Sequence, residues 1–91
     1  MRIVKTTLAR GHMLFALADG RYMYVQGEMT LGMKFYADKG FAWYWIEEPK
    51  RTIYLLTDAD IIRKVTDGEK DELAVAITEY YRDKDFQVIV D

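Results

Sequence analysis

Two runs of residues that favour β-strands surround an Asp-Gly pair near the start of the chain. The runs cover residues 12–18 and 21–27, and Asp19 and Gly20 lie between them. An Asp-Gly pair in this position is a strong signal for a tight β-hairpin, and the expected type I′ turn needs positive φ at both of its residues. This feature constrains the fold most, because it commits the first half of the chain to antiparallel strands.

Strand patterns continue on both sides of this hairpin. The predicted strands cover residues 2–6, 12–18, 21–27, 33–37, 41–46, 52–56 and 86–91. Gly27 and Gly32 bracket four residues and indicate a turn or bulge after the third strand. The last strand follows a helical pattern, and we expect it to return to the sheet.

Helical spacing appears only in the last third of the chain. Its apolar residues fall three and four positions apart, at Leu73, Ile77, Tyr80 and Tyr81. Thr66 and Glu69 form a capping box in front of this pattern, which fixes the start of the predicted helix. A shorter helix is predicted over residues 57–65, with Thr57 or Asp58 as its cap.

These elements predict one α+β domain over residues 1–91. We expect a mostly antiparallel β-sheet, one long C-terminal helix and a short helix packed on one face, and a C-terminal strand. A chain of 91 residues has room for a single hydrophobic core.

An unusually aromatic stretch covers residues 35–48 and reads FYADKGFAWYWIEE. Strand alternation places three of its large side chains on one side, Phe41, Trp43 and Trp45. We expect these to form core under the helix face of Leu73 and Ile77. The opposite side carries Ala42, Tyr44 and Ile46, and we expect Tyr44 to be exposed because a phenol tip favours water or a partner.

Catalytic and metal-binding patterns are sparse in the sequence. His12 is the only histidine and there is no cysteine, so no histidine-based catalytic triad and no thiolate site is indicated. Asp58 and Asp60 do not begin an EF-hand loop, because its obligatory glycine position holds Arg63. The adjacent residues Glu47 and Glu48 would point to opposite faces of a strand. The sequence therefore predicts a protein that is not an enzyme, with no catalytic residue, no cofactor and no bound metal.

The whole chain has a net charge of −2, and its acidic residues are concentrated in the second half. Residues 1–45 carry six basic and three acidic residues, whereas residues 46–91 carry seven basic and twelve acidic ones. This distribution favours a basic protein partner over direct contact with nucleic acid. The alternative is that the acids only solvate a helix surface.

Aromatic residues in such numbers are typical of protein-binding surfaces. The residues expected to contact the partner are the tyrosines and acids nearest the aromatic stretch: Glu28, Tyr36, Tyr44, Glu47, Glu48, Asp58 and Asp60. The longest uninterrupted apolar run has six residues, and the start of the chain lacks the apolar segment of a signal peptide. We therefore expect a cytoplasmic protein that neither enters a membrane nor carries an export signal.

The order of these features resembles a known class of small bacterial proteins. The segments that carry the resemblance are MRIVKTT at the start, QGE at 26–28, FYAD at 35–38, the stretch from Trp45 to Pro49, and LTDADIIRKV at 56–65. Gly27-Glu28 and Trp45 to Pro49 are the most specific of them. This pattern resembles the immunity proteins of polymorphic-toxin and contact-dependent inhibition systems, and the immunity protein 74 family in particular.

The resemblance implies that the protein binds a cognate toxin domain and blocks it, in many cases by covering the active site. Because such toxins are frequently basic nucleases, the resemblance agrees with the acidic second half of the chain. Two other classes of function stay open at this point. One is a self-associating structural module whose aromatic residues pair with a second copy, and the other is a small enzyme that uses tyrosines and carboxylates in a cleft.

Overall fold

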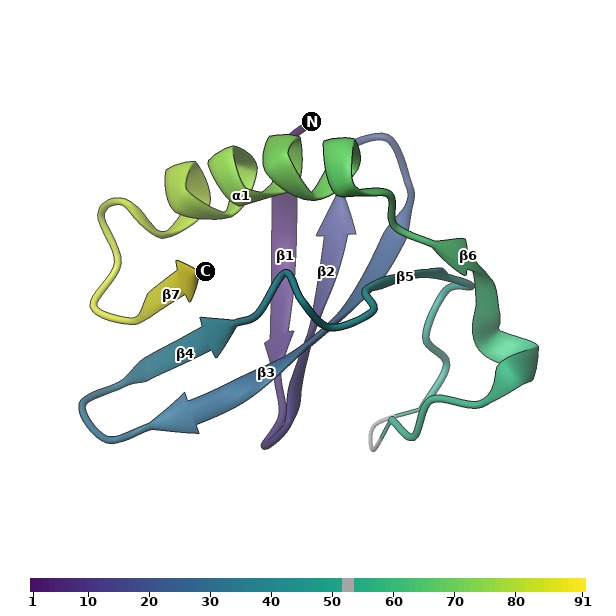
Figure 1. The fold of residues 1–91 in the computed structure, drawn as a ribbon, viewed down its shortest axis with the longest axis horizontal. Helices are drawn as coiled ribbons and strands as arrows, with labels where there is room; N and C mark the ends of the chain where they lie inside the picture. The colour runs from purple at the N-terminus through teal and green to yellow at the C-terminus, as the bar shows by residue number, and fades with distance from the viewer. Residues whose placement is uncertain (52–53) are drawn as a thin grey trace.

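The structure is a computed structural model that describes residues 1–51 and 54–91. It confirms the α+β class, with one helix and a mixed sheet that ends in a C-terminal strand (Figure 1). The elements are, in chain order, β1 (Ile3–Leu8), β2 (His12–Leu17), β3 (Tyr22–Thr30), β4 (Lys34–Ala37), β5 (Tyr44–Ile46), the 3₁₀ turn η1 (Asp58–Asp60), β6 (Ile61–Lys64), α1 (Asp67–Tyr81) and β7 (Gln87–Val90).

The sheet follows the order β1-β2-β3-β4-β7, and β5 and β6 branch from β3. Every pair is antiparallel except β4 with β7, which run parallel because α1 lies between them in the chain. The sheet curls, and α1 crosses one end of it above β1 and β2 (Figure 1). The predicted return of the last strand to the sheet is thus confirmed.

Strand β3 is shared by two parts of the sheet. Its first half pairs with β2 on one edge and with β5 on the other, whereas Gly27 to Thr30 pair with β4. The Gly27 N–H donates to the carbonyl of Gly11, which lies on the β2 side of β3. Strands β5 and β4 therefore pair one after the other along the opposite edge of β3. A Cβ at Gly27 would lie 2.2 Å from the Tyr36 carbonyl oxygen and 2.5 Å from the Phe35 ring. Only glycine allows this approach.

The hairpin predicted at Asp19-Gly20 is present, but its turn differs from the expected one. Gly20 has φ of 91°, and Asp19 is not among the residues with positive φ. The Gly20 N–H donates to the Leu17 carbonyl and the Leu17 N–H to the Arg21 carbonyl. This pattern fits a type I turn followed by a bulged glycine, in which a single positive φ is sufficient.

The predicted C-terminal helix and its capping box are confirmed. The Glu69 N–H donates to Thr66 Oγ1 at 3.2 Å, and Glu69 Oε1 accepts from the Thr66 N–H at 2.9 Å. The helix buries Leu73 and Ile77 as its pattern predicted, whereas Tyr80 and Tyr81 are only partly buried. It also buries Ala76 and Lys70. The Lys70 ammonium donates to the carbonyls of Lys39 and Phe41 at 2.6 and 2.9 Å, which ties α1 to the loop between β4 and β5.

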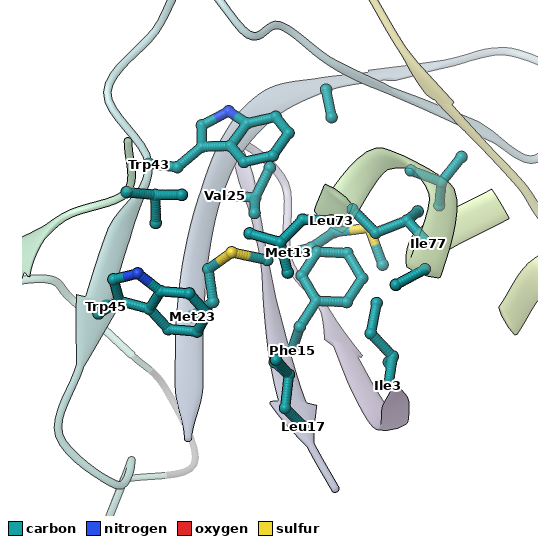
Figure 2. Packing of buried hydrophobic residues seen from close by; sticks show 14 of the residues in the cluster. Ile3, Met13, Phe15, Leu17, Met23, Val25, Trp43, Trp45, Leu73 and Ile77 are labelled. Atoms are coloured by element: carbon teal, nitrogen blue, oxygen red, sulfur yellow. The ribbon is translucent and has the colours of Figure 1, made fainter. Parts of the chain in front are cut away.

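Both tryptophans belong to the main core cluster, as predicted, together with Leu73 and Ile77. In Figure 2 the tryptophans lie on one side of this cluster and Ile77 on the other. Trp43 is fully buried and its indole N–H donates to the Asp38 carbonyl at 3.0 Å. Phe41 was expected on the same side, and this expectation is wrong because its side chain is 53% exposed. Residues 38–43 leave the strand as a loop and β5 begins only at Tyr44, so strand alternation does not apply to Phe41.

Three other predicted boundaries also differ from the structure. The helix expected over residues 57–65 is only the turn η1, and β6 occupies the rest. The turn expected between Gly27 and Gly32 begins later, since β3 continues to Thr30. The strand expected at residues 52–56 lies partly outside the described residues, and residues 54–56 are irregular.

A second, smaller apolar cluster lies on the outer face of the sheet. Leu14 of β2 and Ile46 of β5 pack there against Tyr54, with several tyrosines around them, Tyr22, Tyr24 and Tyr44. Tyr54 and Leu56 therefore cover the apolar outer side of β5. Tyr44 packs against this cluster, so it is half-buried and not exposed as expected.

Gly27→Ala tests the approach of β3 and β4. We expect it to lower the free energy of unfolding by at least about 1–3 kcal/mol, because an added Cβ must push backbone and aromatic atoms aside. Urea denaturation measures this change. Gly68→Ala is the matched control, since it adds a methyl group where no atom lies within 4 Å and improves helix propensity. Equal stability of the two variants would contradict the close approach.

Trp43→Ala tests the burial of the aromatic stretch. We expect a loss of about 3–5 kcal/mol, the usual cost of truncating a fully buried aromatic side chain. Phe41→Ala, two residues away and largely exposed, should cost less than about 1 kcal/mol. Thermal melting followed by circular dichroism compares the two, and a larger loss for Phe41→Ala would reverse the assignment of core and surface.

Candidate protein-binding surface

The seven residues predicted to contact a partner fall into two groups in the structure. Glu28 of β3 and Tyr36 of β4 are cross-strand neighbours, and both side chains are exposed. The other group lies at the far end of the molecule, around β5 and η1 (Figure 1). We call this second group the β5–η1 surface, and its members are Tyr44, Glu47, Glu48, Asp58 and Asp60.

Backbone pairing places Glu47 beside Asp60 within the β5–η1 surface. The Glu47 N–H donates to the Asp60 carbonyl at 2.9 Å, which extends the pairing of β5 with β6 by one position. Pro49 follows two residues later and cannot donate a further ladder hydrogen bond. Glu47 and Glu48 are consequently exposed where the ladder ends.

Asp60 has mainly a structural role within this surface. Its carboxylate accepts from the Thr57 N–H at 3.0 Å, from Thr57 Oγ1 at 2.8 Å and from the Arg51 guanidinium at 3.1 Å. The hydrogen bonds from Thr57, with Arg51 nearby, lower the pKa of Asp60. Asp58, at the start of η1, is exposed. The capping role suggested for Thr57 or Asp58 belongs to Thr57, which precedes the turn as its N-cap.

A cleft of about 400 Å³ opens beside Glu47 and Glu48. Its lining is formed by residues of the β2–β3 turn, β5 and β6: Gly20, Arg21, Tyr22, Trp45, Ile46, Glu47, Glu48, Ile62 and Arg63. The Arg21 guanidinium lies 4.2 Å from the centre of the Trp45 ring, and the Arg63 guanidinium lies 6.0 Å from it. The buried indole therefore positions two cations by cation–π contact.

Both arginines of the cleft are compensated within the protein. Arg21 forms a salt bridge with Asp19 at 2.8 Å, and Arg63 donates two hydrogen bonds of 2.7 Å to the two carboxylate oxygens of Glu69. Among residues 1–51 and 54–91, no basic side chain lies within salt-bridge distance of Glu47 or Glu48. The charge that this cleft offers to a partner is therefore negative.

Tyr22 and Ile62 complete the cleft, and the sequence did not single them out as contact residues. The Tyr22 hydroxyl donates to Glu48 at 3.1 Å, and this hydrogen bond raises the Tyr22 pKa. Ile62 is 58% exposed, which is unusual for an isoleucine in a strand. The available signal for Tyr22 was its place on the same strand face as Tyr24, whereas Ile62 was hidden by the incorrect helix over residues 57–65.

The remaining candidate groups lie elsewhere. His12 stacks on Tyr24, with 4.6 Å between ring centres, and burial lowers its pKa. Within the described part of the chain, no three histidine, cysteine or acidic residues are grouped as metal ligands. Over the same residues, no helix has the length and apolar character needed to cross a membrane.

Comparisons of the chain with protein-family models, with curated proteins and with solved structures found no match. The likeness to immunity proteins thus continues to rest on the short motifs of the sequence.

Glu69→Gln tests the link between the cleft and the start of α1. Hydrogen bonds from Arg63, and then from the Thr66 backbone, hold the Glu69 pKa well below its ordinary value of 4.5. A depressed carboxyl pKa stabilises the fold above the unfolded-state pKa, and this contribution declines as the pH falls below it. We expect Glu69→Gln to cost about 1 kcal/mol at pH 7 and the difference from wild type to narrow below about pH 4.5.

Urea denaturation between pH 7 and pH 3 measures this difference. Glu72→Gln, an exposed acid on the same helix, is the control and should show little change at any pH. A difference for Glu69→Gln that stays constant down to pH 3 would mean that its carboxylate is not stabilised in the folded state.

Proposed function

We propose that this chain is a binding protein that neutralises a toxin domain by covering it, and that the β5–η1 surface with its cleft is the contact. One observation carries the proposal. Glu47 and Glu48 present two exposed carboxylates in a cleft whose arginines are already paired and whose wall includes the exposed side chain of Ile62. Such a surface favours a basic partner, because opposite charges speed encounter and Tyr22 and Ile62 supply contact area.

The nature of the partner is inferred from the sequence resemblance to immunity proteins. Basic nuclease toxins fit the charge of the surface, and the neutralising protein would act in the cytoplasm, where such a toxin reaches its substrate. In this proposal the chain itself carries out no reaction. It inhibits by occupying the toxin surface, and Tyr22 and Ile62 of the cleft exclude water around the charged contacts.

The net negative charge of α1 is a second source of attraction for a basic partner. Five acids and one lysine lie within Asp67–Tyr81. Because these charges act at long range, they increase the rate of encounter without selecting a docking geometry. Charge changes on α1 therefore separate general attraction from specific contact at the β5–η1 surface.

Co-expression is the direct test of toxin neutralisation. The probe is the toxin domain encoded next to the gene for this chain, expressed in bacteria with and without it. We expect growth arrest without the chain, growth with it, and a complex that elutes as one species in size-exclusion chromatography. Failure to protect and to form this complex would refute the proposal, and elution of the free chain as a dimer would favour the self-associating module instead.

Reversal of Glu47 and Glu48 to Lys tests the contact surface. We expect association with the toxin domain to slow by about tenfold at low salt, and its salt dependence to weaken, because electrostatic steering is removed. Folding stability should change by less than about 0.5 kcal/mol, since both residues are exposed. Stopped-flow binding at several salt concentrations measures the rate.

The matched control reverses Glu72 and Asp83 to Lys, which changes the net charge equally at exposed positions on and after α1. The control should slow association less and leave the dissociation rate unchanged. If both double variants bind at the same reduced rate with the same dissociation rate, the β5–η1 surface is not the specific contact.

A further inference from the structure

A second hollow lies on the outer face of the β1–β2 hairpin, distinct from the cleft beside Glu47. It is a groove of about 780 Å³ between this hairpin and the chain segment that follows β5. The volume falls within the range of about 300–1,000 Å³ that small-molecule sites occupy. The proposed toxin contact shares Tyr22 and Glu48 with this groove, where the two hollows meet.

The lining of the groove is mainly apolar. Leu14 and Ala16 of β2 contribute from the sheet, and Pro49, Tyr54 and Leu55 contribute from the covering segment. Leu55 is 72% exposed at the groove, whereas Tyr54 is only 7% exposed. A small ligand could therefore bury an apolar body against side chains that the fold already holds in place.

Basic residues outnumber acidic ones around this lining. Lys5, Arg10 and Arg51 contribute cations, and Glu48 contributes the single carboxylate. Arg51 is paired with Asp60. Within residues 1–51 and 54–91, no acid lies within salt-bridge distance of Lys5 or Arg10. The groove thus offers two uncompensated cations, opposite in sign to the charge of the cleft.

Tyr54 forms a fixed part of the groove wall. Its side chain is buried against Leu14 and Ile46, and its ring centre lies 6.5 Å from that of His12. Its hydroxyl is inaccessible to solvent and has no hydrogen-bond partner among the described residues. A ligand in the groove would therefore meet the ring of Tyr54 and not its hydroxyl.

We propose that this groove binds a small amphipathic organic anion, a molecule with an apolar body and a carboxylate or similar acidic group. The apolar body lies against Leu14, Ala16 and Leu55, and the acidic group is attracted by Lys5 and Arg10. A long-chain carboxylate and an aromatic carboxylate share this chemistry. The inference does not depend on toxin binding.

Fluorescence of 1-anilinonaphthalene-8-sulfonate tests the proposal, since this probe has an aromatic body and one anionic group. We expect saturable binding of one probe per chain with unchanged near-ultraviolet circular dichroism. In ¹⁵N-edited NMR spectra, shifts should concentrate on residues 5–16, 48–51 and 54–55. Absence of binding, or shifts spread over α1 and β7 instead, would overturn the proposal.

Variants separate the charge of the groove from its apolar lining. Lys5→Glu with Arg10→Glu should lower the affinity for the anionic probe at least tenfold. The affinity for the neutral analogue N-phenyl-1-naphthylamine should change less than twofold. The control combines Lys34→Glu with Lys64→Glu, which changes the net charge equally at positions outside the groove lining. It should leave the dissociation constant of the anionic probe within twofold of the wild-type value. Equal weakening by both pairs would overturn the proposal.

Ala16→Phe fills the sheet side of the groove and should lower the affinity for both probes at least fivefold. If Ala16→Phe does not fold, the double variant Lys5→Glu, Arg10→Glu still tests the proposal. Competition by decanoate and by 1-naphthoate then identifies the body of the ligand, and the stronger competitor indicates an alkyl or an aromatic one. If neither displaces the probe, the groove does not bind carboxylates and the proposal fails.

Discussion

The backbone approach of β3 and β4 at Gly27 is the constraint on which the rest of the sheet depends. It lets one long strand pair with β2 and β5 in its first half and with β4 in its second. Because a side chain at this point would collide with Tyr36 and Phe35, the two parts of the sheet could not otherwise share a strand. The curl that results leaves a concave side for α1 and directs β5 and β6 away from β4 (Figure 1).

A buried cation then fixes the loop that leads into β5. The Lys70 side chain is buried, yet its ammonium meets two carbonyls and lies 5.6 Å from the centre of the Trp43 ring. Hydrogen bonds of this kind offset the cost of removing a charge from water. With Lys39 and Phe41 held by α1, Trp43 enters the core and β5 begins at a defined position. The exposure of Glu47 and Glu48 at its end is a consequence of this packing.

Local signals in the sequence predicted the elements that depend on local interactions. The capping box of Thr66 and Glu69 and the spacing of Leu73 and Ile77 fixed α1, and the Asp-Gly pair located the first hairpin. The helix over residues 57–65 was wrong because neighbouring isoleucines fit a helix as well as a strand, and pairing with β5 decides between them.

The candidate surface was predictable only in part, for a similar reason. Acidic and aromatic composition singled out Glu47, Glu48 and Tyr44. The cleft itself depends on contacts between distant segments, such as Arg21 against Trp45 and Glu47 beside Asp60. No pattern in a single sequence reports such contacts. The same holds for the groove on the β1–β2 hairpin, which exists because the chain after β5 folds back over the outer face of the sheet.

The parallel pair of β4 and β7 has a consequence for the order in which the protein folds. Hairpins such as β1–β2 and β2–β3 join neighbouring segments and form on a microsecond timescale in isolation. Phe35 pairs with Val88, and the chain between them includes β5, β6 and α1. Closing so long a loop costs entropy before any contact compensates for it. We therefore expect the hairpins to assemble first, with the docking of α1 and β7 as the late, rate-limiting step.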